Sequence, residues 1–207
     1  MTLEAGQGAA VVHVIDDDAA VRDSIAFLLE TADLTVRTYE SAVAFLDAKD
    51  IARGCIVTDV RMPEMSGVEL VRRLKTLGRT DPVIVITGHA DVPLAVEAMK
   101  AGVADFIEKP FDDEVLLAAI HSALRQGDAQ ARRGAEQAQA AERLASLSAR
   151  EREVLEGLVA GRANKVIAFD LGISPRTGEV YRANLMDKMG AASLSELVRM
   201  ALLAEAR

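Results

Sequence analysis

VVHVIDDD, residues 11–18, decides how the N-terminal part of this chain folds, because an apolar run ends there in three aspartates. The same order recurs along the chain, where a reactive side chain follows an apolar run at Asp59, Thr87 and Lys109. Continuous apolar runs are typical of buried parallel strands. Open parallel sheets place their functional sites at the carboxyl ends of the strands. The sequence therefore predicts that these groups meet at one edge of a sheet.

Helical patterns separate the apolar runs and complete five β/α repeats. The expected helices cover residues 20–32, 42–47, 67–77, 92–101 and 112–124, and one further short strand covers residues 36–39. Strands that alternate with helices of this length predict a parallel sheet covered on both faces. We therefore expect an α/β fold, a doubly wound five-stranded parallel sheet of the flavodoxin-like kind.

The reactive side chains suit one kind of chemistry. Carboxylates that converge on one point repel each other unless a cation lies among them, and Mg²⁺ commonly takes one or two carboxylates, waters and phosphate oxygens. A carboxylate such as Asp59 can attack a phosphoryl group, and Lys109 and Thr87 can contact the transferred group. The acidic run alone could instead be a charge cluster at a helix N-terminus. His89 is expected to shape the loop after Thr87.

The last 60 residues have helical patterns only. Ser148 and Glu151 have the spacing of a capping box, as do Ser193 and Glu196 near the end of the chain. These two boxes predict the starts of the first and last helices of an all-α domain.

Two further helices are expected between them. Asn164 is expected to cap a short helix over residues 165–171 that turns Val166 inward, and Ser174 followed by a proline opens a helix over residues 175–189. Two helices joined by a tight glycine turn predict a helix-turn-helix motif. The generic motif alone is a weak signal.

Composition divides the chain into three parts. Residues 1–125 carry 12 basic and 21 acidic side chains, whereas residues 148–207 carry 9 basic and 8 acidic ones. Residues 126–147 are rich in Ala, Gln, Arg and Glu, which suits an exposed helix or a flexible tether, and we favour a helical linker. The last part is only mildly basic, so its charge alone does not indicate nucleic-acid binding.

Compartment and membrane association follow from a few absences in the sequence. The only cysteine is Cys55, so an intramolecular disulfide is excluded and a reducing compartment is expected. No apolar run approaches the roughly 20 residues of a membrane span. Residues 1–8 lack a basic region followed by an apolar one. We expect a cytoplasmic protein without membrane association.

Residues 8–125, with the motifs described above, resemble the receiver domain of two-component response regulators. The resemblance implies that Asp59 accepts a phosphoryl group and that the Lys109–Pro110 peptide bond is cis. The implied ligands of Mg²⁺ are Asp16, Asp17, Asp59 and the backbone carbonyl of Arg61. The implied switch and phosphate-binding residues are Thr87, Phe106 and Lys109. Because Phe106 stands where many members have tyrosine, its movement would act through burial alone.

The C-terminal residues resemble the LuxR-type DNA-binding domain. The resemblance rests on LSAREREVL (147–155), NKVIA (164–168) and SPRT (174–177). It implies that Glu179, Val180 and Ala183 face the DNA groove. The implied phosphate or base contacts are Lys165, Arg176, Thr177, Arg182 and Lys188.

Gly178 departs from the family pattern, in which a valine usually follows the threonine. A glycine inside a helix costs about 1 kcal/mol relative to alanine. We therefore expect a weaker recognition helix and a missing apolar contact, with reduced DNA affinity, unless tertiary packing compensates.

The stretches at residues 86–102 and 105–111 most resemble the FixJ branch of the response regulators. This implies a transcription activator that receives phosphate from a sensor histidine kinase, forms a homodimer, and acts with RNA polymerase on promoter double-stranded DNA. Nitrogen-fixation genes are the implied target, with another regulon as the alternative.

Two other classes of protein remain to be weighed. A phosphatase or ATPase is disfavoured, because Arg61 rather than an acid stands two residues after Asp59 and no Gly-rich phosphate loop is evident. An adaptor whose helical tail binds protein or RNA would be excluded by DNA-binding assays. We therefore expect a regulator and not an enzyme.

Overall fold

The computed structural model describes residues 10–88 and 92–205. The chain divides into two compact units, Met1–Ala129 and Gln130–Arg207. His89 lies outside the described residues, so its expected role in the loop is not tested. No helix of the described residues is long and apolar enough to cross a membrane.

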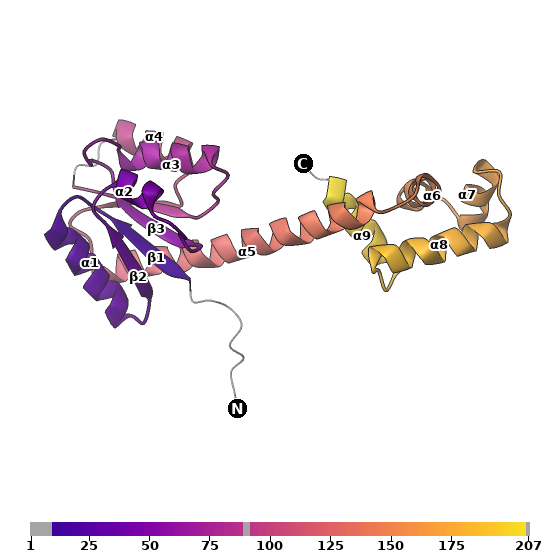
Figure 1. The fold of residues 1–207 in the computed structure, drawn as a ribbon, viewed down its shortest axis with the longest axis horizontal. Helices are drawn as coiled ribbons and strands as arrows, with labels where there is room; N and C mark the ends of the chain where they lie inside the picture. Colours follow the sequence, from indigo (N-terminus) through magenta and orange to yellow (C-terminus); the bar gives the residue numbers. More distant parts are fainter. Residues whose placement is uncertain (1–9, 89–91, 206–207) are drawn as a thin grey trace, which may run out of the picture. The chain divides into compact units, whose positions relative to one another are not determined.

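The first unit contains one parallel sheet of five strands in the order β2-β1-β3-β4-β5 (Figure 1). The strands are β1 Val11–Ile15, β2 Thr35–Tyr39, β3 Gly54–Asp59, β4 Val83–Thr87 and β5 Asp105–Glu108. Every neighbouring pair is parallel. The strand order reverses between β1 and β3, and doubly wound sheets carry their ligand sites at that point. The predicted fold class is confirmed.

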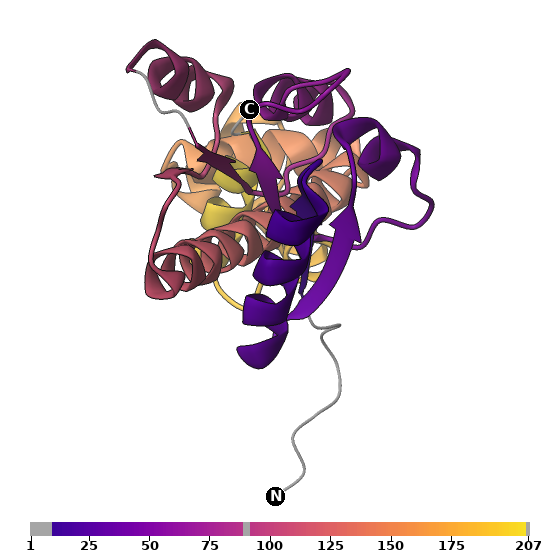
Figure 2. The same ribbon diagram turned by 90° about the vertical axis from the view of Figure 1, so that its left-hand side faces the viewer.

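Helices cover both faces of this sheet (Figure 2). They are α1 Ala19–Thr31, α2 Ala42–Asp47, α3 Gly67–Thr76, α4 Val92–Ala101 and α5 Asp113–Ala145. Buried side chains of α1 and α5 pack on one face, and those of α2, α3 and α4 pack on the other. The continuous apolar runs of β1 and β4 are buried along their whole length because both faces are covered.

The structure extends the last helix of the first unit far beyond the expected residues 112–124, because α5 continues to Ala145. Most of the segment 126–147, expected to be a helical linker, is therefore helical. The domain limits at residues 125 and 148 stay a prediction, since the division into compact units falls inside α5.

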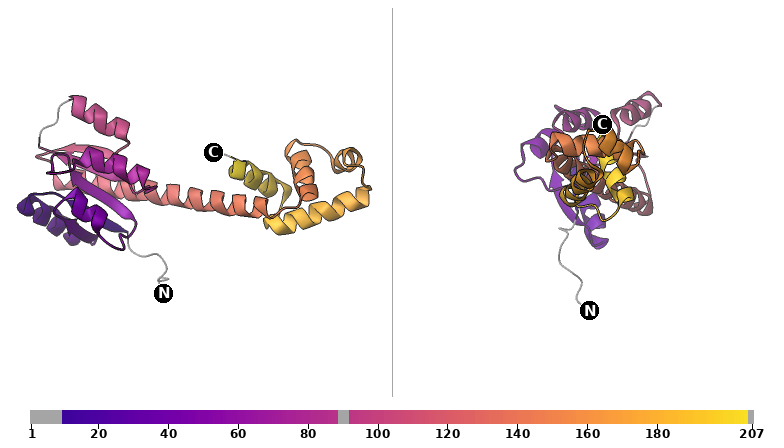
Figure 3. Two further views of the ribbon diagram at one scale, coloured as in Figure 1. Left: turned by 45° about the horizontal axis from the view of Figure 1, so that its top comes forward. Right: turned by 90° about the vertical axis from the view of Figure 1, so that its right-hand side faces the viewer.

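The second unit consists of helices among its described residues (Figure 3). After the end of α5 they are α6 Ala149–Val159, α7 Asn164–Asp170, α8 Pro175–Met189 and α9 Leu194–Glu205. Their core is built from leucine, valine, isoleucine and methionine side chains of all four helices. Gly172, with a φ of +66°, makes the turn between α7 and α8.

Two expected helix starts are confirmed and two are corrected. The capping box at Ser148 and the N-cap at Ser174 are present. The N-cap of α7 is Ala163, which has no capping side chain, and Asn164 is already inside the helix. At α9, Ser193 accepts from the Glu196 amide, but the Glu196 carboxylate accepts from the Ala192 amide instead of closing the box.

The packing of α7 against α8 corrects two further expectations. Val166 is 47% exposed rather than turned inward. Gly178 is buried, and a Cβ atom built there would lie 3.3 Å from Cβ of Ala168. The apolar contact expected to be missing is therefore replaced by a close approach of the two helices.

A buried histidine links β1 to its surroundings in the first unit. His13 is fully buried, with Nε2 3.0 Å from the Ala52 carbonyl oxygen and Nδ1 3.1 Å from the Tyr39 hydroxyl. Because a carbonyl only accepts, Nε2 is assigned the proton and the Tyr39 hydroxyl donates to Nδ1. Burial lowers the pKa of His13 below its usual value of 6.5.

This network predicts a pH dependence of stability. The unfolded chain takes up a proton on His13 near pH 6.5, whereas the folded chain resists it, so the free energy of unfolding falls as the pH drops below 6.5. Urea unfolding of the full chain between about pH 5 and 7.5 should show a smaller pH slope for His13→Gln than for the wild type. The exposed His121→Gln is the matched control and should keep the wild-type slope. Equal slopes in all three proteins would contradict the prediction.

Candidate functional site

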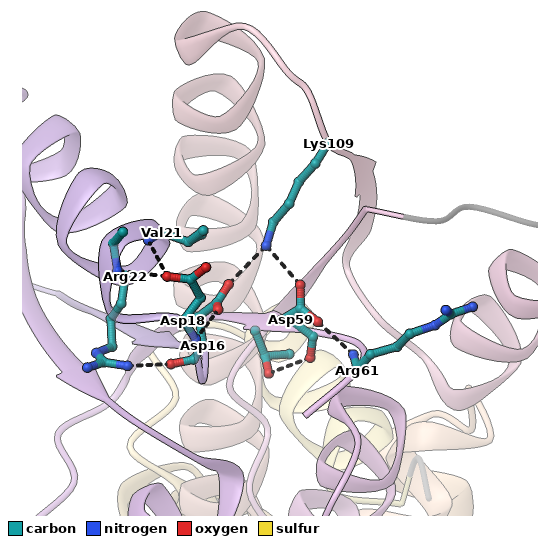
Figure 4. A network of polar contacts seen from close by, with 9 residues as sticks. Asp16, Asp18, Val21, Arg22, Asp59, Arg61 and Lys109 are labelled. Atoms are coloured by element: carbon teal, nitrogen blue, oxygen red, sulfur yellow. Dashed lines mark hydrogen bonds and ion pairs between the residues drawn. The ribbon is translucent and has the colours of Figure 1, made fainter. Parts of the chain in front are cut away.

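Two carboxylates from neighbouring strands meet at the carboxyl edge of the sheet (Figure 4). Asp16 directly follows β1 and Asp59 is the last residue of β3. The Lys109 ammonium, after β5, lies 2.9 Å from Oδ2 of Asp16 and 2.9 Å from Oδ1 of Asp59. The edge that the sequence predicted therefore brings two acids and one cation into direct contact.

The remaining oxygens of these carboxylates are held by the backbone. Oδ1 of Asp16 accepts from the Asp18 amide at 2.9 Å, and Oδ2 of Asp59 accepts from the Arg61 amide at 2.6 Å. The Arg61 side chain extends away from the carboxylates (Figure 4). These bonds orient both acids because their lone pairs are fixed by amides that the chain itself positions.

The charge balance of this cluster is incomplete. Burial raises the pKa of Asp16 although Lys109 donates a hydrogen bond to it. Burial also opposes the charge of Lys109, but its hydrogen bonds to Asp59 and Asp16 raise its pKa. Two carboxylates and one ammonium leave a net negative charge, so the cluster favours an additional cation.

The donor set suits a hard divalent ion, but only two acids are joined. Asp17 is exposed, and the described part of the chain contains no group of three or more His, Cys, Asp or Glu side chains that could hold a metal. The predicted trio of Asp16, Asp17 and Asp59 is therefore not assembled as one cluster. Because Mg²⁺ accepts one or two carboxylates and completes its shell with water and carbonyl oxygens, Asp16 and Asp59 still fit it.

Of the other expected residues, Thr87 lies at this edge, whereas Phe106 pairs with Val85, two residues before the end of β5. Thr87 ends β4, is 1% exposed, and its carbonyl oxygen accepts from the Lys109 amide at 2.8 Å. Phe106 on β5 is half-buried against the core under α2, α3 and α4. The peptide bond between Lys109 and Pro110 is cis, as the resemblance implied.

Three residues outside the predicted site support it. Asp18 caps α1 by accepting from the Ala20 amide at 2.8 Å, and Arg22 donates to the Asp16 carbonyl oxygen at 2.6 Å. Gly67 opens α3, and a Cβ atom built there would collide with the Asp59 carbonyl oxygen. An acidic residue directly before a helix is a recognisable N-cap signal, whereas the close approach at Gly67 leaves no local signal beyond the glycine itself.

The second candidate site is the exposed side of α7 and α8 in the C-terminal unit. Ser174 accepts from the Thr177 amide at 3.1 Å and fixes the start of α8. Seven of the expected contact residues are exposed on these helices, namely Lys165, Arg176, Thr177, Glu179, Val180, Ala183 and Lys188. Arg182 is half-buried.

Lys188 differs from the other expected contact residues because it has a partner inside the protein. Its ammonium lies 2.8 Å from the carboxylate of Glu151, which is buried and also caps α6. The hydrogen bond from Lys188 and those from Ser148 lower the pKa of Glu151 to about 2. The structure therefore gives Lys188 an internal role at the end of α8.

Comparison with known proteins identifies the two domains that contain these candidate sites. Residues 12–121 match the response regulator receiver domain, and residues 145–201 match the luxR family of bacterial regulatory proteins. The chain belongs to the two-component response regulators that carry a LuxR-type DNA-binding domain. Proteins of this class are transcription regulators rather than enzymes, so the predicted class is confirmed.

Within that class the chain is similar to FixJ-type regulators. It is 62% identical over 194 residues to the transcriptional regulatory protein FixJ of Azorhizobium caulinodans, covering 93% of this chain and 92% of the relative. It also matches the crystal structure of full-length FixJ from B. japonicum, with 54% identity, a TM-score of 0.60, and 96% and 98% of the two chains covered. The response regulator protein TodT of Pseudomonas putida is 44% identical, with 93% and 85% covered.

The contact at Gly67 predicts a large effect of a small substitution. Gly67→Ala should lower the free energy of unfolding by about 1–3 kcal/mol, because the added methyl group forces α3 away from the end of β3. Urea unfolding of the full chain measures this. Gly134→Ala, where nothing lies within 4 Å of the added Cβ, is the control and should not destabilise. A Gly67→Ala protein as stable as the wild type would contradict the close approach.

The Glu151 cluster predicts a second pH effect, at acid pH. The pKa of Glu151 is about 2 in the folded chain against 4.5 for the free group, so its contribution is complete above pH 4.5 and is lost as the pH falls toward 2. Glu151→Gln should therefore be less stable than the wild type at neutral pH, and the difference should shrink below pH 4.5. Urea unfolding followed by circular dichroism, at neutral pH and below pH 4.5, measures the stability of both proteins. A difference that is independent of pH would refute the assignment.

Proposed function

We propose that this protein is a phosphorylation-controlled transcription activator in which Asp59 accepts a phosphoryl group from a sensor histidine kinase. The proposal rests above all on Lys109, whose ammonium bridges Asp16 and Asp59 at 2.9 Å each at the edge where doubly wound sheets bind ligands. A cation in that position can contact both the attacking carboxylate and the incoming phosphoryl oxygens.

The proposed step is a direct transfer to the carboxylate. A carboxylate oxygen of Asp59 attacks phosphorus, the new O–P bond forms, and the N–P bond to the kinase histidine breaks, so the imidazole leaves and takes up a proton. Lys109 balances the charge on the phosphoryl oxygens. The Arg61 amide, now 2.6 Å from Asp59, keeps the carboxylate oriented.

Mg²⁺ is the proposed cofactor of this step. Asp16, Asp17, Asp59 and the Arg61 carbonyl would hold it, which would require exposed Asp17 to join the two acids that are already together. When bound, the ion neutralises charge on the carboxylates and on the phosphoryl oxygens. It would also oppose the rise in the pKa of Asp16 that burial causes.

We further propose that Thr87 and Phe106 report the phosphorylation of Asp59. Phosphate adds charge and acceptor oxygens at the strand edge, which draws the Thr87 hydroxyl inward. Phe106 then moves into the vacated space and changes the surface formed by α4 and β5. This supports homodimer formation by the phosphorylated protein.

DNA recognition is proposed for the exposed side of α8. Arg176, Thr177, Glu179, Val180, Arg182 and Ala183 would enter or border the major groove, and Lys165 would contact the backbone. We propose that Lys188 contributes through its bond to Glu151 rather than through DNA. The regulator would act in the cytoplasm on promoter DNA, together with RNA polymerase.

The similarity to FixJ proteins supports nitrogen-fixation genes as the target. The alternative is a different regulon, because TodT is also similar over most of its length.

A single comparison tests the proposal. The full chain treated with acetyl phosphate and Mg²⁺ should incorporate phosphate and sediment as a dimer, and its affinity for double-stranded DNA should rise by about tenfold or more, about 1.4 kcal/mol. Asp59→Asn should lose all three responses because the amide cannot be phosphorylated. The exposed Asp23→Asn is the matched control and should respond as the wild type does.

Two outcomes would count against it. Normal phosphate incorporation by Asp59→Asn would exclude Asp59 as the acceptor. Phosphorylation without any change in DNA affinity or sedimentation would favour a protein-binding adaptor.

A further inference from the structure

Two consecutive residues at the C-terminal end of α8 form hydrogen bonds to other helices of the C-terminal unit. The Lys188 ammonium binds the Glu151 carboxylate at 2.8 Å, and the Met189 carbonyl oxygen accepts from Nη1 of Arg143 at 2.7 Å. Arg143 lies in the last turn of α5 and Glu151 in the first turn of α6. Both hydrogen bonds therefore connect the end of α8 to the short segment at residues 143–151.

The Arg143 contact is built into the end of α8. The last carbonyls of a helix have no partner within it, and a cation there is favoured by the helix dipole. Gly190, with a φ of +65°, ends the helix, and a Cβ atom built on it would lie only 2.7 Å from Nη1 of Arg143. The glycine thus provides both the left-handed backbone and the space that the guanidinium occupies.

The segment that receives these two bonds is itself well held. Leu147 is buried in the core of the C-terminal unit, and Leu144 packs against it. Arg152 donates to the Leu144 carbonyl oxygen at 3.3 Å, and the capping box closes between Ser148 and Glu151. Residues 143–151 can therefore act as a rigid base for α8.

We propose that Arg143 is a positioning residue for DNA recognition, which together with the Lys188–Glu151 pair sets the direction of α8 from the chain that leaves α5. The proposal rests on the DNA binding proposed above. Arg143 does not contact the bases in this account, because it is engaged by Met189.

Geometry makes the direction of α8 decisive. Thr177 and Met189 are twelve positions apart on α8, and at 1.5 Å per residue this is about 18 Å. A tilt of roughly 10° at the fastened end moves the Thr177 end by about 3 Å, which is as long as a hydrogen bond. Base contacts would then be lost, whereas attraction to phosphates, which depends on charge, would change little.

The test compares sequence-specific with non-specific binding. A duplex is first selected from a random-sequence library with the full-length wild type treated with acetyl phosphate and Mg²⁺. The ratio of Kd on unrelated DNA to Kd on the selected duplex is then measured for each variant at one salt concentration. Arg143→Gln should lower this ratio about tenfold, which corresponds to about one lost base contact. Arg143→Lys keeps the positive charge and a hydrogen-bond donor, so its ratio of Kd values should lie between those of Arg143→Gln and the wild type.

The control removes the same charge from an exposed position on the same helix. Arg133→Gln should weaken binding to both DNAs equally and leave the ratio unchanged. Thermal unfolding is recorded for all variants. A lower Tm of Arg143→Gln with an unchanged ratio would overturn the positioning role and leave only a stabilising one. If the wild type enriches no duplex, the proposed DNA-binding function falls and this proposal falls with it.

Discussion

The mutual repulsion of two carboxylates is the constraint on which the first unit depends. Parallel strands bring Asp16 and Asp59 to the same edge, where burial raises the pKa of Asp16. The Lys109 ammonium offsets this by bonding to both. In the proposed function, the ammonium that holds this edge together is shared with the phosphoryl group as a third anion.

The second unit solves a similar problem in a different way. Glu151 is buried where a carboxylate would be costly, and it is balanced by Lys188 and by the amide and hydroxyl of Ser148. All of these partners lie within the unit, so the Glu151 carboxylate is balanced by groups of the C-terminal unit itself. Lys109 bridges two carboxylates at the edge of the sheet, whereas Lys188 joins α8 to the start of α6.

The strand ends and the helix starts at Ser148 and Ser174 were readable from the sequence because they are local patterns. Asp59, Lys109 and the Ser148 box lie where their neighbours in the chain predicted. Contacts between distant segments were not readable in this way. The partner of Lys188 is 37 positions away, and the close fit of Gly178 against Ala168 depends on how two helices cross. From residue type alone, Lys188 was expected to contact DNA and Gly178 was expected to weaken its helix.

The contact between Gly178 and Ala168 has a consequence for protein engineering. Two small residues face each other there, and a Cβ atom at position 178 would lie 3.3 Å from that of Ala168. Because these two residues are in contact, positions 168 and 178 should be exchanged together between related regulators. If a recognition helix with a larger residue at position 178 were transplanted here, Ala168 would have to move by a few tenths of an ångström to admit the added Cβ atom.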